Sequence, residues 1–137
     1  NCMSKYLDEA IKLRARTDRH YNCAQAVFVP FVKDANNDEE TAYRIAANFG
    51  SGMKMASTCG AITGGLMVLG LYGVDDPATI TQYYKRFKDA HEGMMNCADL
   101  LKANFEKGGA KKPHCDAMVY EAISYVENIL QERHIID

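Results

Sequence analysis

The stretch from residue 57 to residue 70 reads STCGAITGGLMVLG and opens the most apolar run of the chain. Ser57 or Thr58 can act as the N-cap of a helix, because a hydroxyl there accepts a hydrogen bond from a free N–H of the first turn. Cys59 then lies in that first turn, where unpaired N–H groups and the helix dipole stabilise a thiolate and lower its pKa. The stretch therefore predicts a helix that begins at a reactive cysteine, although a glycine-lined core helix with an inert, buried cysteine fits the same residues.

Three glycines follow Cys59 in this helix, at Gly60, Gly64 and Gly65. Each weakens a helix by roughly 1 kcal/mol relative to alanine, so we expect another backbone or a bound group to come close to them. We interpret Gly60 and Gly64 as residues that border a cofactor or reactive site. Gly65 is interpreted as a glycine that packs against a neighbouring helix.

The composition is that of a soluble globular domain. The 137 residues carry a formal net charge of -2, with 47% hydrophobic and 25% charged residues, so a single domain with a sizeable core is expected. This charge balance argues against a nucleic acid or an anionic membrane as a partner. Residues 1–21 lack an apolar core followed by a small-residue cleavage site, so we expect no signal peptide and a cytoplasmic location.

The uncharged run from Ala56 to Val74 is long enough to cross a bilayer. Five of its residues are glycine, and the segments around it are amphipathic and need an apolar surface to pack against. We therefore predict a buried central helix and no membrane insertion.

Helical periodicity recurs along the chain, and no alternating strand pattern is present. Ser4, Asn22, Asp38 and Asn96 are predicted N-caps. The fold class is therefore all-α, a single-domain bundle of about six or seven helices. The predicted helices cover residues 5–16, 23–33, 39–49, 59–72, 78–91, 97–104 and 113–133, separated by turns and by a loop over 105–112.

Some features of these helices are more specific. Pro30 should kink the second helix or loosen its last turns. In the third helix the expected core face includes Ala42 and Ile45, with Gly50 as the C-cap. The glycine-rich residues 50–56 resemble a phosphate-binding loop in composition only, since no strand precedes them and no Gly-Lys-Ser/Thr follows, so nucleotide binding is not expected.

Five cysteines are present, and no two of them form a Cys-x-x-Cys pair. This odd number and the wide spacing argue against a secreted disulfide framework and against a zinc finger. We assign no role to Cys2, near the terminus. The other four each fall within the first turn of a predicted helix and on its apolar side: Cys23, Cys59, Cys97 and Cys115.

A thiolate at such a position can attack a disulfide, hold zinc or ligate an iron–sulfur cluster. Helix ends in a bundle can meet at one pole, so we expect the four cysteines to converge there. His20 and His114 adjoin Cys23 and Cys115 in sequence. Either histidine could donate to a thiolate or complete a metal site, and either could be a solvated loop residue.

The pattern also resembles a family of small redox-active proteins named for their C-GCAxxG-C-C cysteines. The matching residues are YNCAQAV at 21–27, CGAITGG at 59–65, NCADLL at 96–101, and Cys115. They span most of the chain in the family's order. One departure is HEGMM at 91–95, where the family pattern leads us to expect an aromatic residue and a glycine that end the helix.

The resemblance implies a helical domain with four functional cysteines, a redox or metal-centred role, and genes that often lie near transporter genes. Similar domains occur joined to c-type haem modules, but no Cys-x-x-Cys-His is present here, so covalent haem is not expected.

We predict a four-cysteine site for thiol–disulfide exchange or electron transfer, in which Cys59 attacks as a thiolate and a second cysteine resolves the mixed disulfide. The alternatives are an iron–sulfur or zinc site held by the same cysteines, and a non-enzymatic interaction module for a transporter or a redox partner protein. The sequence leaves assembly into a homo-oligomer open.

Overall fold

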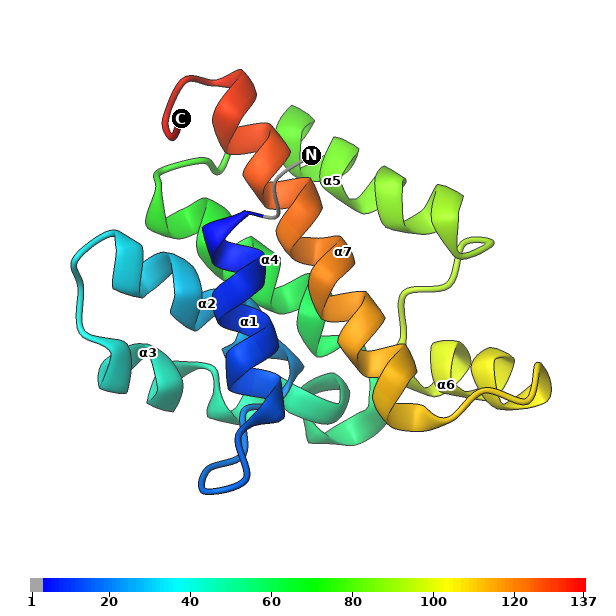
Figure 1. Cartoon of the computed structure of the whole chain (residues 1–137). Helices are drawn as coiled ribbons and strands as arrows, with labels where there is room; N and C mark the ends of the chain where they lie inside the picture. Colours follow the sequence, from blue (N-terminus) through cyan, green and yellow to red (C-terminus); the bar gives the residue numbers. More distant parts are fainter. Residues whose placement is uncertain (1–3) are drawn as a thin grey trace.

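The computed structural model describes residues 4–137, so Cys2 lies outside the described residues. Seven α-helices account for most of this part of the chain (Figure 1), and no strand occurs within it. The predicted all-α fold is confirmed. The helices are α1 Lys5–Ala15, α2 Cys23–Asp34, α3 Glu39–Ile45, α4 Gly60–Leu71, α5 Pro77–Ala90, α6 Cys97–Glu106 and α7 Lys111–Glu132.

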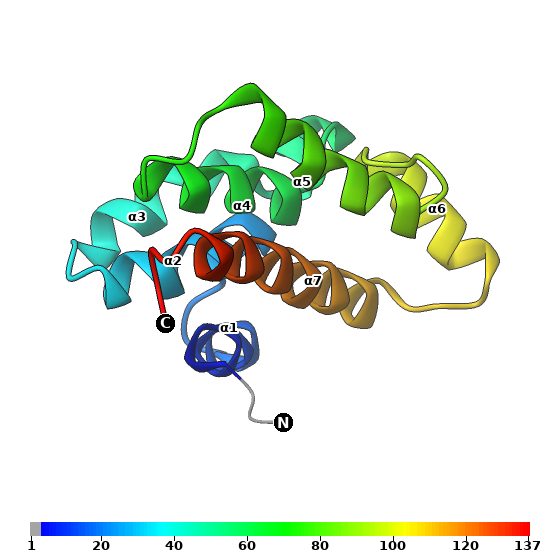
Figure 2. The ribbon, with the colours of Figure 1, turned by 90° about the horizontal axis from the view of Figure 1, so that it is seen from above.

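The helices form layers, which are seen edge-on in Figure 2. Helix α1 lies on one side, α2 and α7 lie in the middle, and α4 and α5 lie on the other side. Helix α4 packs against both α2 and α7, and α1 packs on the opposite side of the same two helices. This arrangement buries the uncharged α4, whose Ile62, Val68 and Leu69 are fully buried.

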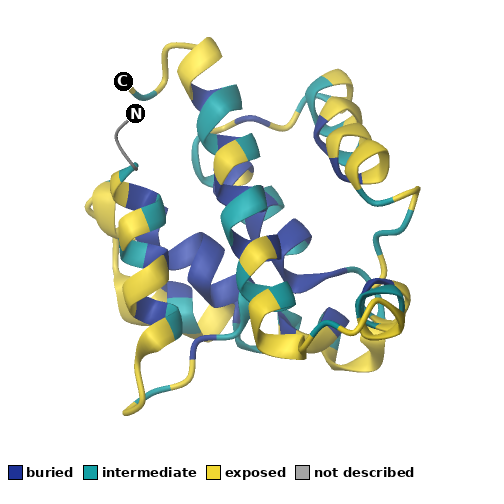
Figure 3. Ribbon diagram, turned by 45° about the vertical axis from the view of Figure 1, so that its right-hand side comes forward, coloured by how far each residue is buried: buried dark blue, intermediate teal, exposed yellow. Residues whose placement is uncertain are grey.

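The core follows the predicted apolar faces (Figure 3). Helix α2 has neighbours on several sides, so every residue from Ala24 to Val32 is buried, and the helix continues through Pro30 to Asp34. The six inward residues predicted for the last helix are all buried: Met118, Val119, Ala122, Ile123, Val126 and Leu130. Ser4, Asn22 and Asp38 each cap their helix through the side chain, as predicted.

The predicted helix boundaries are wrong at two places, after α3 and between α6 and α7. Helix α3 ends at Ile45, and the chain turns into a short 3-10 segment, Ala47–Phe49, which leaves Ile45 exposed. Gly50 has φ -71 and ψ 160, which is an extended conformation and not a left-handed C-cap. The loop after α6 is shorter than expected because α6 continues to Glu106 and α7 begins at Lys111.

No helix within residues 4–137 has both the length and the apolar composition that crossing a membrane requires. Helix α4 has 12 residues, about half of what a bilayer needs.

Candidate functional site

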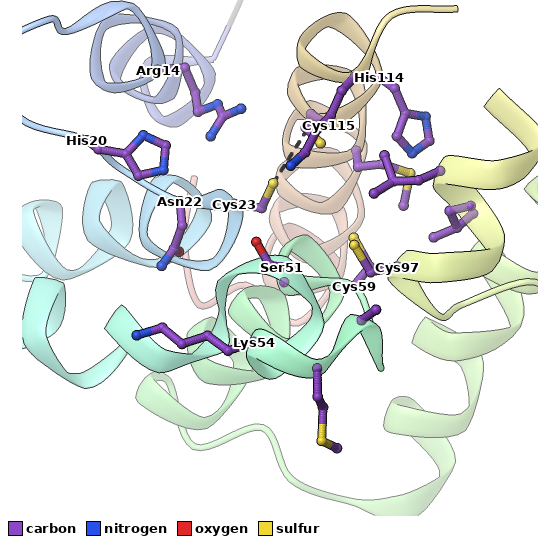
Figure 4. Close-up of a pocket in the computed structure, with 17 residues that line it drawn as sticks. Arg14, His20, Asn22, Cys23, Ser51, Lys54, Cys59, Cys97, His114 and Cys115 are labelled. Atoms are coloured by element: carbon purple, nitrogen blue, oxygen red, sulfur yellow. Dashed lines mark hydrogen bonds between the residues drawn. The ribbon is translucent and has the colours of Figure 1, made fainter. Parts of the chain in front are cut away.

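The four predicted cysteines line a single cavity of about 400 Å³ near the N-terminal ends of α2, α4 and α6 (Figure 4). Cys23 and Cys97 are the first residues of α2 and α6, and Cys59 is the N-cap immediately before α4. Cys115 differs from the prediction because α7 begins at Lys111, which places this cysteine one turn inside the helix. The expected convergence of the four residues is confirmed.

Cys23 is positioned by the cap of its own helix. The Asn22 side chain accepts from the Gln25 N–H at 2.8 Å, and the Asn22 N–H donates to the Gln25 side chain at 2.8 Å. This reciprocal capping box fixes the first turn of α2. The Asn22 amide also donates to the carbonyl of Ala47 at 3.1 Å, so the segment before α4 is tied to the start of α2.

Cys59 and Cys97 are brought together by the backbone. The Cys59 N–H donates to the Met95 carbonyl at 2.9 Å, and the Cys97 N–H donates to the Ser57 carbonyl at 2.6 Å. Thr58 and Asn96 form the antiparallel bridge between these two bonds. Because this pairing holds both segments extended, neither Ser57 nor Thr58 caps α4, and no side chain does so. The predicted side-chain cap from Asn96 is likewise absent at α6.

Cys23 and Cys115 form the second close pair, between α2 and α7. The Cys23 sulfur lies 4.0 Å from the carbonyl oxygen of Cys115, and Figure 4 shows the two side chains next to each other. Four free cysteines are therefore arranged as two neighbouring pairs around one cavity.

Arg14 of α1 lies beside the Cys23–Cys115 pair (Figure 4), and it is not among the residues predicted for the site. Its Nε donates to Asp116 at 2.7 Å and its Nη1 donates to the Tyr21 carbonyl at 2.8 Å. These bonds hold a guanidinium whose side chain is only 9% exposed. The sequence does indicate that Arg14 is buried. Arg14 follows Tyr6 and Ala10 at i, i+4 spacing and so lies on the buried face of α1.

The electrostatics of this pair favour a thiolate on Cys115. The adjacent Cys23 thiol lowers the pKa of Cys115 to about 6, with help from the positive charges of Arg14 and Lys111 and against the effect of burial. The closeness of Cys115, together with burial, raises the pKa of Cys23 above its ordinary value. A protonated Cys23 therefore lies beside the Cys115 thiolate, in surroundings that favour a nucleophilic cysteine.

The predicted low pKa of Cys59 is wrong. Burial raises the pKa of Cys59 to about 11, although the N–H groups of Ala61 and Ile62 point at its sulfur and lower it. The helix-end effect exists, but the loss of water around a side chain that is 6% exposed outweighs it. Burial also raises the pKa of Cys97.

Both predicted histidines line the cavity. His20 is exposed. Burial and the nearby His91 lower the pKa of His114, which therefore favours the neutral ring. In the part of the chain that the structure describes, no three His, Cys, Asp or Glu side chains gather closely enough to hold a metal ion.

The three glycines of α4 have different surroundings. Gly60 lines the cavity, and a methyl group there would lie 2.8 Å from the Phe49 carbonyl oxygen. Gly64 does not line the cavity: it packs against α2, where a methyl group would lie 2.9 Å from the Ala24 carbonyl oxygen. Gly64 is therefore a packing glycine, in contrast to the prediction. Gly65 faces Tyr83 of α5.

The rim of the cavity between α3 and α4 is a left-handed turn. Ser51, Gly52, Met53 and Lys54 have φ of 52°, 59°, 60° and 58°, and the turn closes with a bond of 2.8 Å from the Ser57 N–H to the Gly52 carbonyl. A left-handed conformation costs a non-glycine residue about 1–2 kcal/mol. Such strain tends to be retained at functional sites. At Gly52 no side chain fits, because a methyl group would lie 2.9 Å from the Cys97 Cβ.

Comparison with known proteins identifies the family of this chain. The sequence model of a family described as "putative redox-active protein (C_GCAxxG_C_C)" matches residues 21–129. The chain belongs to this family. No curated protein and no solved structure matches it. In this C_GCAxxG_C_C protein, the matched region contains all four cysteines that line the cavity.

Proposed function

We propose that this C_GCAxxG_C_C protein catalyses thiol–disulfide exchange, with Cys115 as the attacking thiolate and Cys23 as the resolving thiol. The observation that carries the proposal is the contact between these cysteines in an open cavity, where Arg14 and a neighbouring thiol lower the pKa of Cys115. The redox character of the family supports it. We assign the reaction to the cytoplasm, where thiols are kept reduced.

The reaction proceeds in two displacement steps. The Cys115 thiolate attacks one sulfur of a substrate disulfide, a new S–S bond forms, and the other substrate sulfur leaves as a thiolate that takes a proton from water. Cys23 then loses its proton to water and attacks the Cys115 sulfur as a thiolate. This attack breaks the mixed disulfide and expels the second substrate sulfur as a thiolate, which takes a proton from water. The substrate disulfide gains two electrons, and the protein becomes a Cys23–Cys115 disulfide.

Arg14 has an electrostatic role in this scheme. Its charge stabilises the Cys115 thiolate before attack and lowers the pKa of Cys23, which must lose its proton in the second step. Cys59 and Cys97 have raised pKa values, so they remain protonated at neutral pH. We propose that they form a second thiol pair of the cavity, which reacts with disulfides more slowly than Cys23 and Cys115.

The metal alternative requires three or four sulfurs around one point, each about 2.3 Å from a zinc ion. The described residues hold no such group, so thiol–disulfide exchange is the better supported use of the cysteines. An interaction module for a transporter would not need a cysteine whose pKa is lowered by a nearby arginine and a second thiol.

The test uses Cys2→Ser as the background, which leaves only the four cavity cysteines. The reduced protein is equilibrated without oxygen in mixtures of reduced and oxidised dithiothreitol, quenched with N-ethylmaleimide and mapped by mass spectrometry. We expect a two-electron transition that joins Cys23 to Cys115. Cys115→Ser should abolish the fast reaction with disulfides, and the matched control Cys97→Ser should retain it.

Three results would argue against the proposal. If Cys115→Ser reacts as fast as the background protein, the nucleophile is another cysteine. Stoichiometric iron or zinc in anaerobically purified protein would favour the metal site. If each of the four cysteine-to-serine changes alters stability only, the interaction module is the better description.

A further inference from the structure

We propose that the substrate of the cavity is a small disulfide that carries negative charge, such as one with carboxylate groups. This inference rests on the proposed function and adds the chemical class of the substrate. It is carried by the charges that line the cavity, by their ion-pair partners and by the size of the cavity.

The side chains that line the cavity are basic or neutral. Within residues 4–137 no Asp or Glu lines it. Three permanent cations do so, from three different segments of the chain: Arg14 of α1, Lys54 of the left-handed turn, and Lys111 at the start of α7. The chain as a whole carries a formal net charge of -2, so the excess of positive charge is a local property of this cavity.

Not all of this positive charge is neutralised by the protein. Arg14 is paired with Asp116, which also bonds Lys112. Lys54 donates to the neutral side chain of Asn48 at 2.9 Å. The salt bridges found among the described residues include neither Lys54 nor Lys111.

Lys111 is the cation best placed to meet a substrate. It lines the same cavity as Cys97 and Cys115, and its charge lowers the pKa of both thiols. The ammonium group therefore acts where the substrate disulfide must approach. A carboxylate on the substrate would be attracted to this group, and a cationic substrate would be repelled by it.

The dimensions fit a small molecule. A cavity of about 400 Å³ lies near the lower end of the range of small-molecule sites. Apolar side chains of Leu100, Leu101 and Met118 form part of the wall and can contact the carbon chain of such a disulfide. Cys115 is within reach of a ligand held there, since it lines the same space.

The experiment compares three disulfides of similar size and different charge in the Cys2→Ser background. They are 3,3′-dithiodipropionate with two negative charges, bis(2-hydroxyethyl) disulfide with none, and cystamine with two positive charges. Each rate is divided by the rate of the same disulfide with 2-mercaptoethanol, which removes the difference in intrinsic reactivity. We expect the anionic disulfide to react about tenfold faster than the neutral one, and the preference to weaken at high salt.

Lys111→Gln should reduce the anionic-to-neutral ratio several-fold. The ratio is used because Lys111 also affects the amount of Cys115 thiolate, and this effect cancels between two substrates of one protein. Lys88→Gln is the matched control, since Lys88 is exposed on α5 and does not line the cavity.

The outcomes separate the two proposals. Equal normalised rates for all three disulfides, or fastest reaction with cystamine, would overturn the inference while leaving thiol–disulfide exchange intact. If no disulfide of any charge reacts with Cys115, the proposed function fails and the inference fails with it.

Discussion

Gly65→Ala should destabilise the protein far more than a glycine-to-alanine change on a helix normally does. Tyr83 is fully buried, and its hydroxyl donates to the Ile62 carbonyl at 2.8 Å. That hydroxyl occupies the space of the missing Gly65 side chain: a methyl group at residue 65 would overlap the Tyr83 oxygen and lie 2.8 Å from its Cζ. Val126 lies 3.2 Å away and leaves little room to move.

The expected loss follows from three contributions. Overpacking a well-packed core costs about 1–3 kcal/mol, and a buried hydroxyl that loses its partner costs about 1–3 kcal/mol. Alanine recovers roughly 1 kcal/mol of helix propensity. The free energy of unfolding should therefore fall by about 3 kcal/mol, which corresponds to a fall in Tm of roughly 10 °C for a domain of this size.

Urea and thermal denaturation followed by circular dichroism measure this change. Gly70→Ala is the matched control in the same helix, because nothing lies within 4 Å of the added methyl group, and it should stabilise by about 0.5–1 kcal/mol. Adding Tyr83→Phe to Gly65→Ala removes the overlapping oxygen and should cost less than the sum of the single changes. If Gly65→Ala is as stable as Gly70→Ala, the packing argument for Gly65 is wrong.

Three further predictions concern the rim and the thiolate. Ala56 is exposed and has φ 57°, so Ala56→Gly should raise the free energy of unfolding by about 1 kcal/mol. Ala117→Gly on the exposed face of α7 should instead lower it by about 1 kcal/mol. A change of the same sign for both variants would contradict the strain argument. Arg14→Gln should raise the pKa of Cys115, measured from thiolate absorbance, and no change in pKa would remove Arg14 from the site. Because the pKa of Cys115 is lowered to about 6 in the folded protein, its thiolate stabilises the fold above the unfolded-state pKa of about 8.5, and this contribution is lost as the pH falls through the lowered value. The free energy of unfolding of the reduced protein should therefore rise from about pH 6 to about pH 8.5 relative to Cys115→Ser, and parallel curves for the two proteins would show that no such shift exists.

The fold could be predicted because its signals are local. Asn22 followed by Gln25 specifies the start of α2, and the i, i+3, i+4 spacing from Met118 to Leu130 specifies the buried face of α7. The convergence of the cysteines could also be predicted, since the ends of different helices in a bundle can meet at one pole. The predicted burial of Ile45 is wrong because α3 ends at this residue. The spacing of apolar residues does not indicate where a helix ends.

The identity of the thiolate could not be predicted, because it depends on contacts between segments far apart in sequence. Cys59 has the helix-end position that favours a thiolate, but the packing of α4 and the pairing with residues 95–97 bury its sulfur. Cys115 has a weaker helix-end position, but folding brings it next to Arg14 and Cys23. Desolvation and charge proximity are properties of the folded chain, and here they outweigh the local helix dipole.

The most direct test of the central claim is the rate of alkylation of each cysteine as a function of pH. The reduced Cys2→Ser protein is treated briefly with iodoacetamide between pH 5 and 10, and each site is quantified by peptide mass spectrometry. We predict that Cys115 is modified fastest at neutral pH, with a midpoint well below the usual value of about 8.5, and that Cys59 is modified only at high pH. Fastest modification of Cys59, or a Cys115 midpoint at or above about 8.5, would contradict the account.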